Sequence, residues 1–164
     1  MPHLISRAEA LFELEKNKTE EKCFLCSLVS GNAKFILEKN NLVTVFLSEY
    51  PRFWGQIMIA PNLHSEKFSS LDEGAWKMMN KAALKSARIL EKLFSPARVY
   101  IASTGSPENL PMTCPHNHIN VIPVYDAALK PSQVFTWGNG LYAGREEEWK
   151  ELFSAVNLEW TQSI

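Results

Sequence analysis

Histidine and cysteine are the residues of this sequence best suited to nucleophilic chemistry or metal binding, and the chain has four of the first and three of the second. His116 and His118 stand one residue apart, with Asn120 two positions further on. If residues 116–122 form a strand, alternation places these three side chains on one face and the intervening apolar residues on the other. A neutral imidazole can attack phosphorus when its second ring nitrogen donates a hydrogen bond that fixes the tautomer. The row therefore favours phosphate chemistry.

A bare His-x-His pair also has two other interpretations. The histidines can be surface residues of an edge strand, since such pairs are weakly informative by themselves. They can equally be ligands of a catalytic metal in a hydrolase. Neither interpretation explains the sequence around the pair.

Cys23 and Cys26 have the spacing of one zinc knuckle. A lone Cys-x-x-Cys is also found in redox-active sites or as two buried thiols, and the spacing does not separate these possibilities. Cys114, close to His116, is either an alternative ligand or a plain buried thiol.

Composition limits the class of protein. The chain has 164 residues, 46% of them hydrophobic, which suits one compact domain. Seventeen basic side chains nearly balance eighteen acidic ones, which argues against a nucleic acid duplex or a membrane surface as partner. No apolar run is long enough to span a bilayer, and we expect a cytoplasmic protein because the cysteines form a poor disulfide framework.

The pattern of apolar residues and turn signals predicts an α+β fold in which helices pack on an antiparallel sheet of about five strands. A leader helix is expected at 4–16, and a long helix from a capping box formed by Ser70 and Glu73 as far as Ser95. A last helix is expected from Arg145. The expected strands are 35–37, 42–47, 56–60, 98–102 and 116–122.

The run His116-Asn-His118-Ile-Asn120-Val-Ile-Pro123 resembles the motif of the histidine triad (HIT) family. The resemblance extends over 23–125, because the Cys-x-x-Cys pair, the strand before His64, the long helix and the strand leading to Gly105 follow the order of that family. It implies a HIT domain at 23–125, preceded by a helical extension at 1–22. A C-terminal extension at 126–164, with a helix, would pack on the same domain.

Site residues follow from the resemblance. It implies that His118 is the nucleophile, with Nδ1 held by a backbone carbonyl, and that His116 orients the site or binds metal. Thr113 and Ser103 match positions that contact phosphate. Other matching positions line the base and ribose pocket, although an ordinary core role explains each of them equally well: Phe24, Leu25, Leu28 and Phe46.

Two positions depart from the family pattern. Asn120 replaces the third histidine, and an amide keeps a hydrogen-bond donor but cannot carry charge or shuttle a proton. The chain is similar in this to the glutamine-bearing galactose-1-phosphate uridylyltransferases and diadenosine polyphosphate phosphorylases, so hydrolysis and transfer both stay open. Ser48 stands where many members have an aspartate that grips the ribose, which leaves nucleoside preference open.

The resemblance also implies a structural zinc held by Cys23, Cys26, His64 and His116. It implies an enzyme that cleaves or transfers at the α-phosphate of nucleoside phosphoramidates or dinucleoside polyphosphates, through a covalent nucleotidyl-His118. The alternatives are a nucleotidyltransferase or phosphorylase of the amide-bearing branch, and a zinc-stabilised nucleotide-binding module without turnover. Family members are commonly homodimers, so a homodimer is expected.

Overall fold

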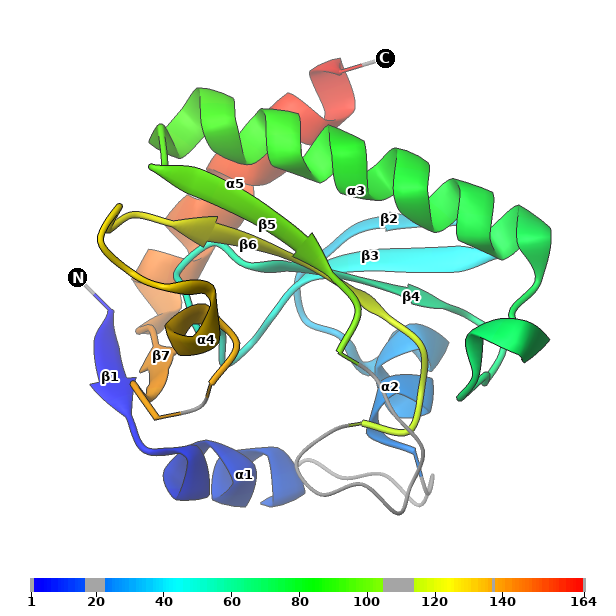
Figure 1. Ribbon diagram of the computed structural model, residues 1–164, viewed down its shortest axis with the longest axis horizontal. Coiled ribbons are helices and arrows are strands. Elements are labelled where there is room, and N and C mark those ends of the chain that lie inside the picture. Colours follow the sequence, from blue (N-terminus) through cyan, green and yellow to red (C-terminus); the bar gives the residue numbers. More distant parts are fainter. Residues whose placement is uncertain (1, 17–22, 105–113, 137, 164) are drawn as a thin grey trace.

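A five-stranded antiparallel sheet forms the centre of the molecule (Figure 1). The computed structural model describes residues 2–16, 23–104, 114–136 and 138–163. In order across the sheet, the strands are β2 (Ile36–Lys39), β3 (Val43–Leu47), β4 (Ile57–Pro61), β6 (Ile119–Val124) and β5 (Arg98–Ala102). The predicted α+β class with five antiparallel strands is confirmed.

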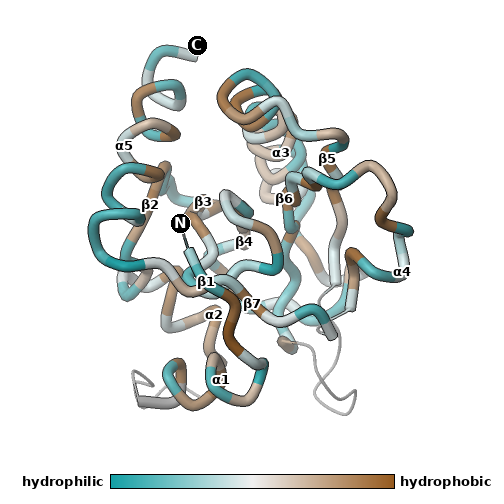
Figure 2. Tube along the Cα trace, turned by 90° about the vertical axis from the view of Figure 1, so that its left-hand side faces the viewer, coloured by the Kyte–Doolittle hydropathy of each residue, from teal (hydrophilic) through white to brown (hydrophobic). Residues whose placement is uncertain are grey.

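Helices cover both faces of the sheet. The long α3 (Glu73–Phe94) and α5 (Glu146–Gln162) lie on one side, and α1 (Arg7–Lys16) and α2 (Phe24–Ser27) lie on the other (Figures 1 and 2). Because each face is covered, every residue of β3 and of β6 is buried, and these strands read as apolar runs rather than as alternating ones. Three shorter segments are the turns η1 (Leu28–Asn32) and η2 (Phe68–Ser70) and the helix α4 (Pro131–Val134).

The main core lies between the sheet and the pair α3 and α5. Strand residues such as Val45 and Ile59 meet Met79 and Leu90 of α3 there, and all four are buried. Helix α5 adds side chains at helical spacing to this core, namely Trp149, Leu152, Val156 and Trp160. The helix predicted from Arg145 is therefore confirmed, with Arg145 as its N-cap.

The predicted capping box of α3 is wrong. Asp72 is the N-cap, and its Oδ1 accepts a hydrogen bond of 2.8 Å from the backbone N–H of Ala75. Ser70 instead ends the turn η2, and its hydroxyl donates to the Lys67 carbonyl at 2.9 Å. Because Leu71 is extended, Ser70 lies too far before the first helical turn to cap it.

The amino-terminal helix begins later than predicted. Residues His3–Ile5 form β1, which pairs antiparallel with β7 (Leu141–Ala143). Ser6 then starts α1, since its N–H donates to Glu9 at 2.7 Å and its hydroxyl accepts from the Glu9 N–H at 3.2 Å. The periodicity that starts at Leu4 is compatible with a helix, but the pairing of Leu4 with Tyr142, 138 positions away, cannot be predicted from it.

Within the described ranges, no helix combines the length and the apolar character that a membrane span requires.

Candidate active site and adjoining metal-ligand cluster

The histidine pair lies just before β6 and not inside it, so the predicted strand at 116–122 starts three residues too early. Contacts to the loop after β4 hold this segment in place. The backbone N–H of Asn117 donates to the Ser65 carbonyl at 2.6 Å, and its side-chain amide donates to the Ser65 hydroxyl at 3.1 Å. Because this segment is not a strand, the side chains of His116 and His118 can lie in two different groups of residues.

His118 is 5% exposed and has a fixed tautomer. Its Nδ1–H donates to the His116 carbonyl at 2.8 Å, which is the contact expected from the resemblance, so the lone pair is on Nε2. Nε2 lies 3.5 Å from the Thr104 hydroxyl. Burial lowers the pKa of His118, and the charge of Arg52 lowers it further, so the neutral ring is favoured.

A chain of buried hydrogen bonds orients Asn120. Gln56 Nε2 donates to Asn120 Oδ1 at 2.8 Å, and Asn120 Nδ2 donates to the Thr104 hydroxyl at 3.1 Å. The amide of Asn120 therefore has its oxygen toward β4 and its nitrogen toward Thr104 and His118. Sequence reasoning missed both partners: Thr104 is one residue beyond the proposed Ser103, and Gln56 was assigned only to a strand.

Arg52 is a buried cation in the same region. The side chain is 8% exposed, and its Nη1 donates to the Phe135 carbonyl at 3.4 Å. Its backbone N–H donates to Gln56 Oε1 at 3.2 Å, so the arginine and the amide chain are directly connected. Burial lowers the pKa of the guanidinium group. No sequence signal identified this residue, because a single arginine between turn residues has no distinctive pattern.

One cavity of about 480 Å³ contains these groups. The apolar positions named by the resemblance all line it, together with Ser48, and they are Phe24, Leu25, Leu28 and Phe46. Leu25 and Phe46 are also 1% and 2% exposed members of a small core with η1 and β4. Leu25 and Phe46 therefore belong both to the core and to the cavity wall, because they pack on one side and face the cavity on the other.

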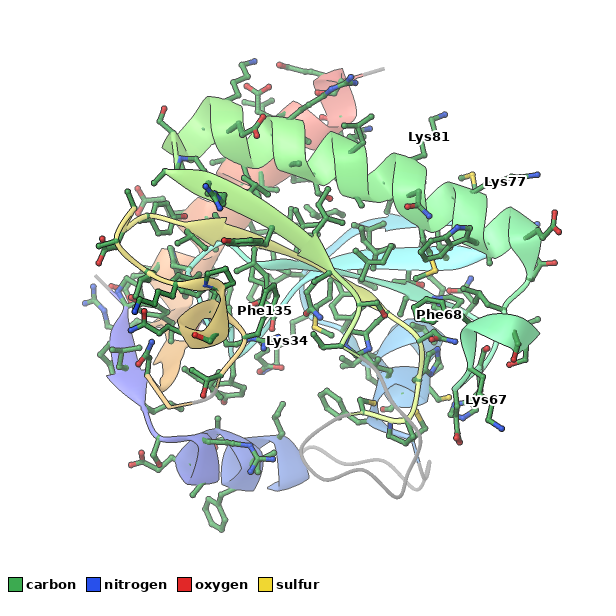
Figure 3. The ribbon with its side chains drawn as sticks, in the orientation of Figure 1. Lys34, Lys67, Phe68, Lys77, Lys81 and Phe135 are labelled. Atoms are coloured by element: carbon green, nitrogen blue, oxygen red, sulfur yellow. The ribbon has the colours of Figure 1, made fainter. Side chains whose placement is uncertain are left out.

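Other walls of the cavity come from segments outside the family resemblance. Helix α1 contributes Arg7, Ala10, Leu11 and Leu14, and the C-terminal extension contributes Phe135 and Leu141. Lys34 and Glu49, which form an ion pair, line it as well (Lys34 and Phe135 are labelled in Figure 3). The residues of α1 and of the C-terminal extension were not predicted to line the cavity, because their place depends on how the two extensions fold back.

Ser103 and Thr113 were predicted to contact phosphate, and only the first of them lies in the part of the chain that the structure describes. Ser103 is not among the residues that line the cavity, whereas its neighbour Thr104 is. The reason is the end of β5 at Ala102: the next residue that turns toward β6 is Thr104, which reaches Asn120. Thr113 lies outside the residues that the structure describes.

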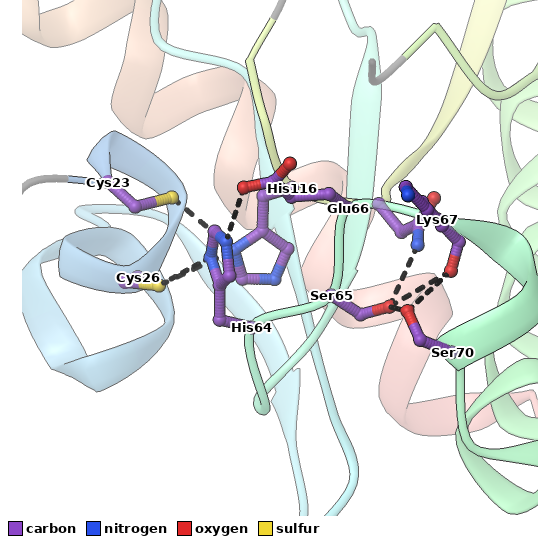
Figure 4. A network of polar contacts seen from close by, with 9 residues as sticks. Cys23, Cys26, His64, Ser65, Glu66, Lys67, Ser70 and His116 are labelled. Carbon is purple, nitrogen blue, oxygen red and sulfur yellow. Dashed lines mark hydrogen bonds and ion pairs between the residues drawn. The ribbon is translucent and has the colours of Figure 1, made fainter. Parts of the chain in front are cut away.

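Cys23, Cys26, His64 and His116 come together beside this cavity, with all four donor atoms within 4.8 Å of one another (Figure 4). The Cys23 and Cys26 sulfurs lie 3.5 Å from His116 Nδ1, and the Cys26 sulfur lies 3.3 Å from His64 Nδ1. Tetrahedral zinc, with Zn–S of about 2.3 Å and Zn–N of about 2.0 Å, places such atoms about 3.6 Å apart. The donor types and their spacing therefore fit zinc.

The second ring nitrogens of both histidines also have partners. His116 Nε2–H donates to the Pro61 carbonyl at 2.9 Å, and His64 Nε2 lies 3.4 Å from a Glu66 carboxylate oxygen. Such contacts orient Nδ1 toward a metal. Cys114 is not a member of the four-residue group, and burial raises the pKa of its thiol to about 12.

His116 links the cluster to the cavity. Its ring lies among the cysteines, while its backbone carbonyl holds His118 Nδ1. Anything that fixes the ring of His116 consequently fixes the imidazole of His118.

Comparisons with known proteins give relatives in sequence and in fold. No protein-family model matches the chain. A relative in Mycoplasma pneumoniae, an uncharacterised 16.1 kDa HIT-like protein, is 26% identical over 117 residues, which cover 70% of this chain and 80% of that protein.

Solved structures share the fold. A zinc-bound histidine triad family protein from Mycobacterium smegmatis superposes with a TM-score of 0.65 at 17% identity, covering 86% of this chain and 94% of that one. A diadenosine triphosphate hydrolase from Plasmodium falciparum gives a TM-score of 0.53 at 17% identity and covers 78% and 75%. The chain therefore has the fold of histidine triad (HIT) family proteins and is similar in sequence to HIT-like proteins.

Proposed function

We propose that this protein cleaves or transfers at the α-phosphate of a nucleotide derivative, with His118 as the nucleophile. The observation that carries the proposal is the single fixed imidazole of His118, whose Nδ1–H is committed to a carbonyl and whose Nε2 lies at a large, partly apolar cavity. Phosphoramidates and dinucleoside polyphosphates are the candidate substrates, and the Plasmodium hydrolase of the same fold supports the second class.

In the first step, Nε2 of His118 gives its electron pair to phosphorus, and the bond from phosphorus to the leaving group breaks with its electron pair on that group. Asn120 and Thr104 stand beside Nε2 and can donate hydrogen bonds to the phosphoryl oxygens. In the second step, an oxygen of water or of another acceptor attacks phosphorus, any proton on that oxygen passes to solvent, and the P–N bond breaks with its electron pair returning to Nε2 of His118.

The apolar wall formed by Phe24, Leu25, Leu28 and Phe46 gives a nucleobase a surface for packing. Ser48, Glu49 and Tyr50 add polar groups at the same cavity. We propose that these groups contact the sugar in place of an aspartate at position 48.

A transferase or phosphorylase is the second candidate, and Asn120 favours it. Gln56 and Thr104 hold the amide in place, and because an amide has no titratable proton it cannot accept a proton from water as a histidine could. A nucleotide-binding module without turnover is the third candidate.

Turnover of adenosine and guanosine phosphoramidates and of dinucleoside polyphosphates, each with and without inorganic phosphate, tests the proposal. Product chromatography would compare the unaltered protein with His118→Ala and with His3→Ala, which removes an exposed histidine outside the cavity. Mononucleotide release that needs no phosphate and is lost only in His118→Ala indicates a hydrolase. Phosphate-dependent products indicate a phosphorylase. No turnover, with nucleotide binding unchanged in His118→Ala, would contradict the nucleophile assignment.

We also propose that Cys23, Cys26, His64 and His116 hold a structural zinc ion. When bound, zinc would cross-link the start of α2 to the loop after β4 and to the segment before β6. The zinc-bound relative in fold supports this assignment. The residues act on the reaction only through His116, whose carbonyl orients His118.

A homodimer in the cytoplasm is the proposed state of the protein. In the described part of the chain β5 pairs only with β6, and Ile101 of β5 and Leu84 of α3 are about half exposed, at 49% and 50%. Light scattering after size exclusion would show a mass of twice one chain, and a mass of one chain would contradict the homodimer.

A further inference from the structure

We propose that Arg52 binds a phosphate oxygen of the substrate and supplies the fixed positive charge that Asn120 cannot. This inference rests on the proposed function, because it assigns a role at the same cavity. The observation that carries it is a guanidinium group buried at the cavity that His118 faces.

Arg52 lies in the connection between β3 and β4, and its contacts include one from the side chain and one from the backbone. Its Nη1 donates to the Phe135 carbonyl at 3.4 Å, a long contact close to the limit for a hydrogen bond. Its backbone N–H donates to Gln56 Oε1 at 3.2 Å. The side chain is thereby turned inward, against the C-terminal extension, and not toward solvent.

Hydrogen bonds connect the backbone of Arg52 to the reacting group. Gln56, which accepts from the Arg52 backbone, donates to Asn120, and Asn120 donates to Thr104 beside Nε2 of His118. The backbone of Arg52, the two side-chain amides, the Thr104 hydroxyl and the imidazole therefore form one connected array, and the Arg52 side chain lines the same cavity.

Burying a guanidinium group has a desolvation cost, and a phosphate ligand offsets this cost with charge-assisted hydrogen bonds. Arginine suits phosphate because its planar group presents a fork of N–H donors. Lys34 and Arg7, which also line the cavity, are both more exposed than Arg52. Of these three cations, Arg52 therefore has the most buried position from which to meet an anion.

A charge of this kind has a chemical consequence. Arginine stays protonated and cannot give a proton to a leaving group, and Asn120 cannot either. When the bond from phosphorus breaks, the electron pair stays on the leaving group without a proton from these residues. Leaving groups that are stable as anions, such as a phosphate ester in a polyphosphate, are then favoured over amines.

Calorimetric titration with AMP and with adenosine tests the inference without turnover. Arg52→Gln is expected to weaken AMP binding by about 10- to 100-fold, the loss typical of a charged hydrogen bond, and to leave adenosine binding unchanged. Arg52→Lys should bind AMP more tightly than Arg52→Gln. Arg88→Gln, which removes an exposed arginine of α3 that does not line the cavity, should match the unaltered protein.

Equal weakening of AMP and adenosine, or no weakening of AMP, in Arg52→Gln would overturn the inference and leave the proposed function standing. Failure of the unaltered protein to bind AMP would overturn both. If Arg52→Gln does not fold, Arg52→Lys decides, because loss of the fork geometry should still weaken AMP binding several-fold with adenosine unchanged.

Discussion

Replacement of Gln56 by leucine tests the buried amide chain on which the site depends. Gln56 is 4% exposed, donates to Asn120 Oδ1 at 2.8 Å and accepts from the Arg52 backbone at 3.2 Å. Leucine has a similar size but can make neither bond. The change therefore leaves one buried acceptor and one buried donor without their present partner.

Each unsatisfied buried group costs about 1–3 kcal/mol, so Gln56→Leu should lower the free energy of unfolding by about 2–4 kcal/mol after partial relaxation. For a chain of this size, 1 kcal/mol corresponds to about 2–4 °C in the midpoint of thermal unfolding. The expected decrease is about 5–15 °C. Turnover should fall too, because the amide of Asn120 is then free to rotate.

Thermal unfolding followed by circular dichroism, without ligand, measures this effect. Gln162→Leu, at an exposed position near the end of α5, is the matched control and should change the free energy of unfolding by less than about 0.5 kcal/mol. If Gln56→Leu unfolds at the same temperature as the control, the amide chain does not stabilise the fold, and the reasoning about Asn120 and Arg52 loses its basis.

Three further outcomes are expected. Removal of zinc by a chelator, with metal content measured by emission spectrometry, should lower the unfolding midpoint by about 5–10 °C, since a ligand at a hundred times its Kd adds about 2.7 kcal/mol. Cys26→Ser should reproduce this loss and Cys114→Ser should keep the metal; equal metal content in both would refute the cluster. Gly144→Ala should cost about 1–3 kcal/mol in calorimetry, because a Cβ there would collide with the Trp54 ring, and an unchanged midpoint would contradict that packing. Leu14→Trp should weaken AMP and adenosine binding alike, because it narrows the cavity; unchanged affinities would mean that α1 does not border the bound ligand.

Local patterns predicted much of the fold. The strands at 98–102 and 42–47 and the long helix follow from the spacing of apolar residues and from turn residues such as Ser95, which adopts a left-handed conformation before Pro96. The Cys-x-x-Cys pair is visible from its own spacing, whereas its grouping with His64 and His116 was expected only from the resemblance to the HIT family. The strands, the helix and the Cys-x-x-Cys spacing depend on neighbours in sequence, which a pattern can record.

The rest depends on register between distant segments. Ala102 pairs with Asn120 across the sheet, and this register brings Thr104, not Ser103, to His118. The partnership of Gln56 with Asn120 likewise follows from the pairing of β4 with β6. No single-residue property distinguishes these residues from others of the same type, so only the three-dimensional structure identifies them.

The ladder between β1 and β7 determines how the protein can be shortened for experiments. The amino-terminal segment pairs with the C-terminal one through this ladder, in which Leu4 lies opposite Tyr142 (Figure 1). Helix α1 follows β1 directly and forms one wall of the cavity. A version trimmed to 23–125 would lack both strands and expose the cavity on that side. Ligand screens, tags and permuted versions of the chain should therefore keep both ends, since an affinity measured on the trimmed form would describe a different binding site.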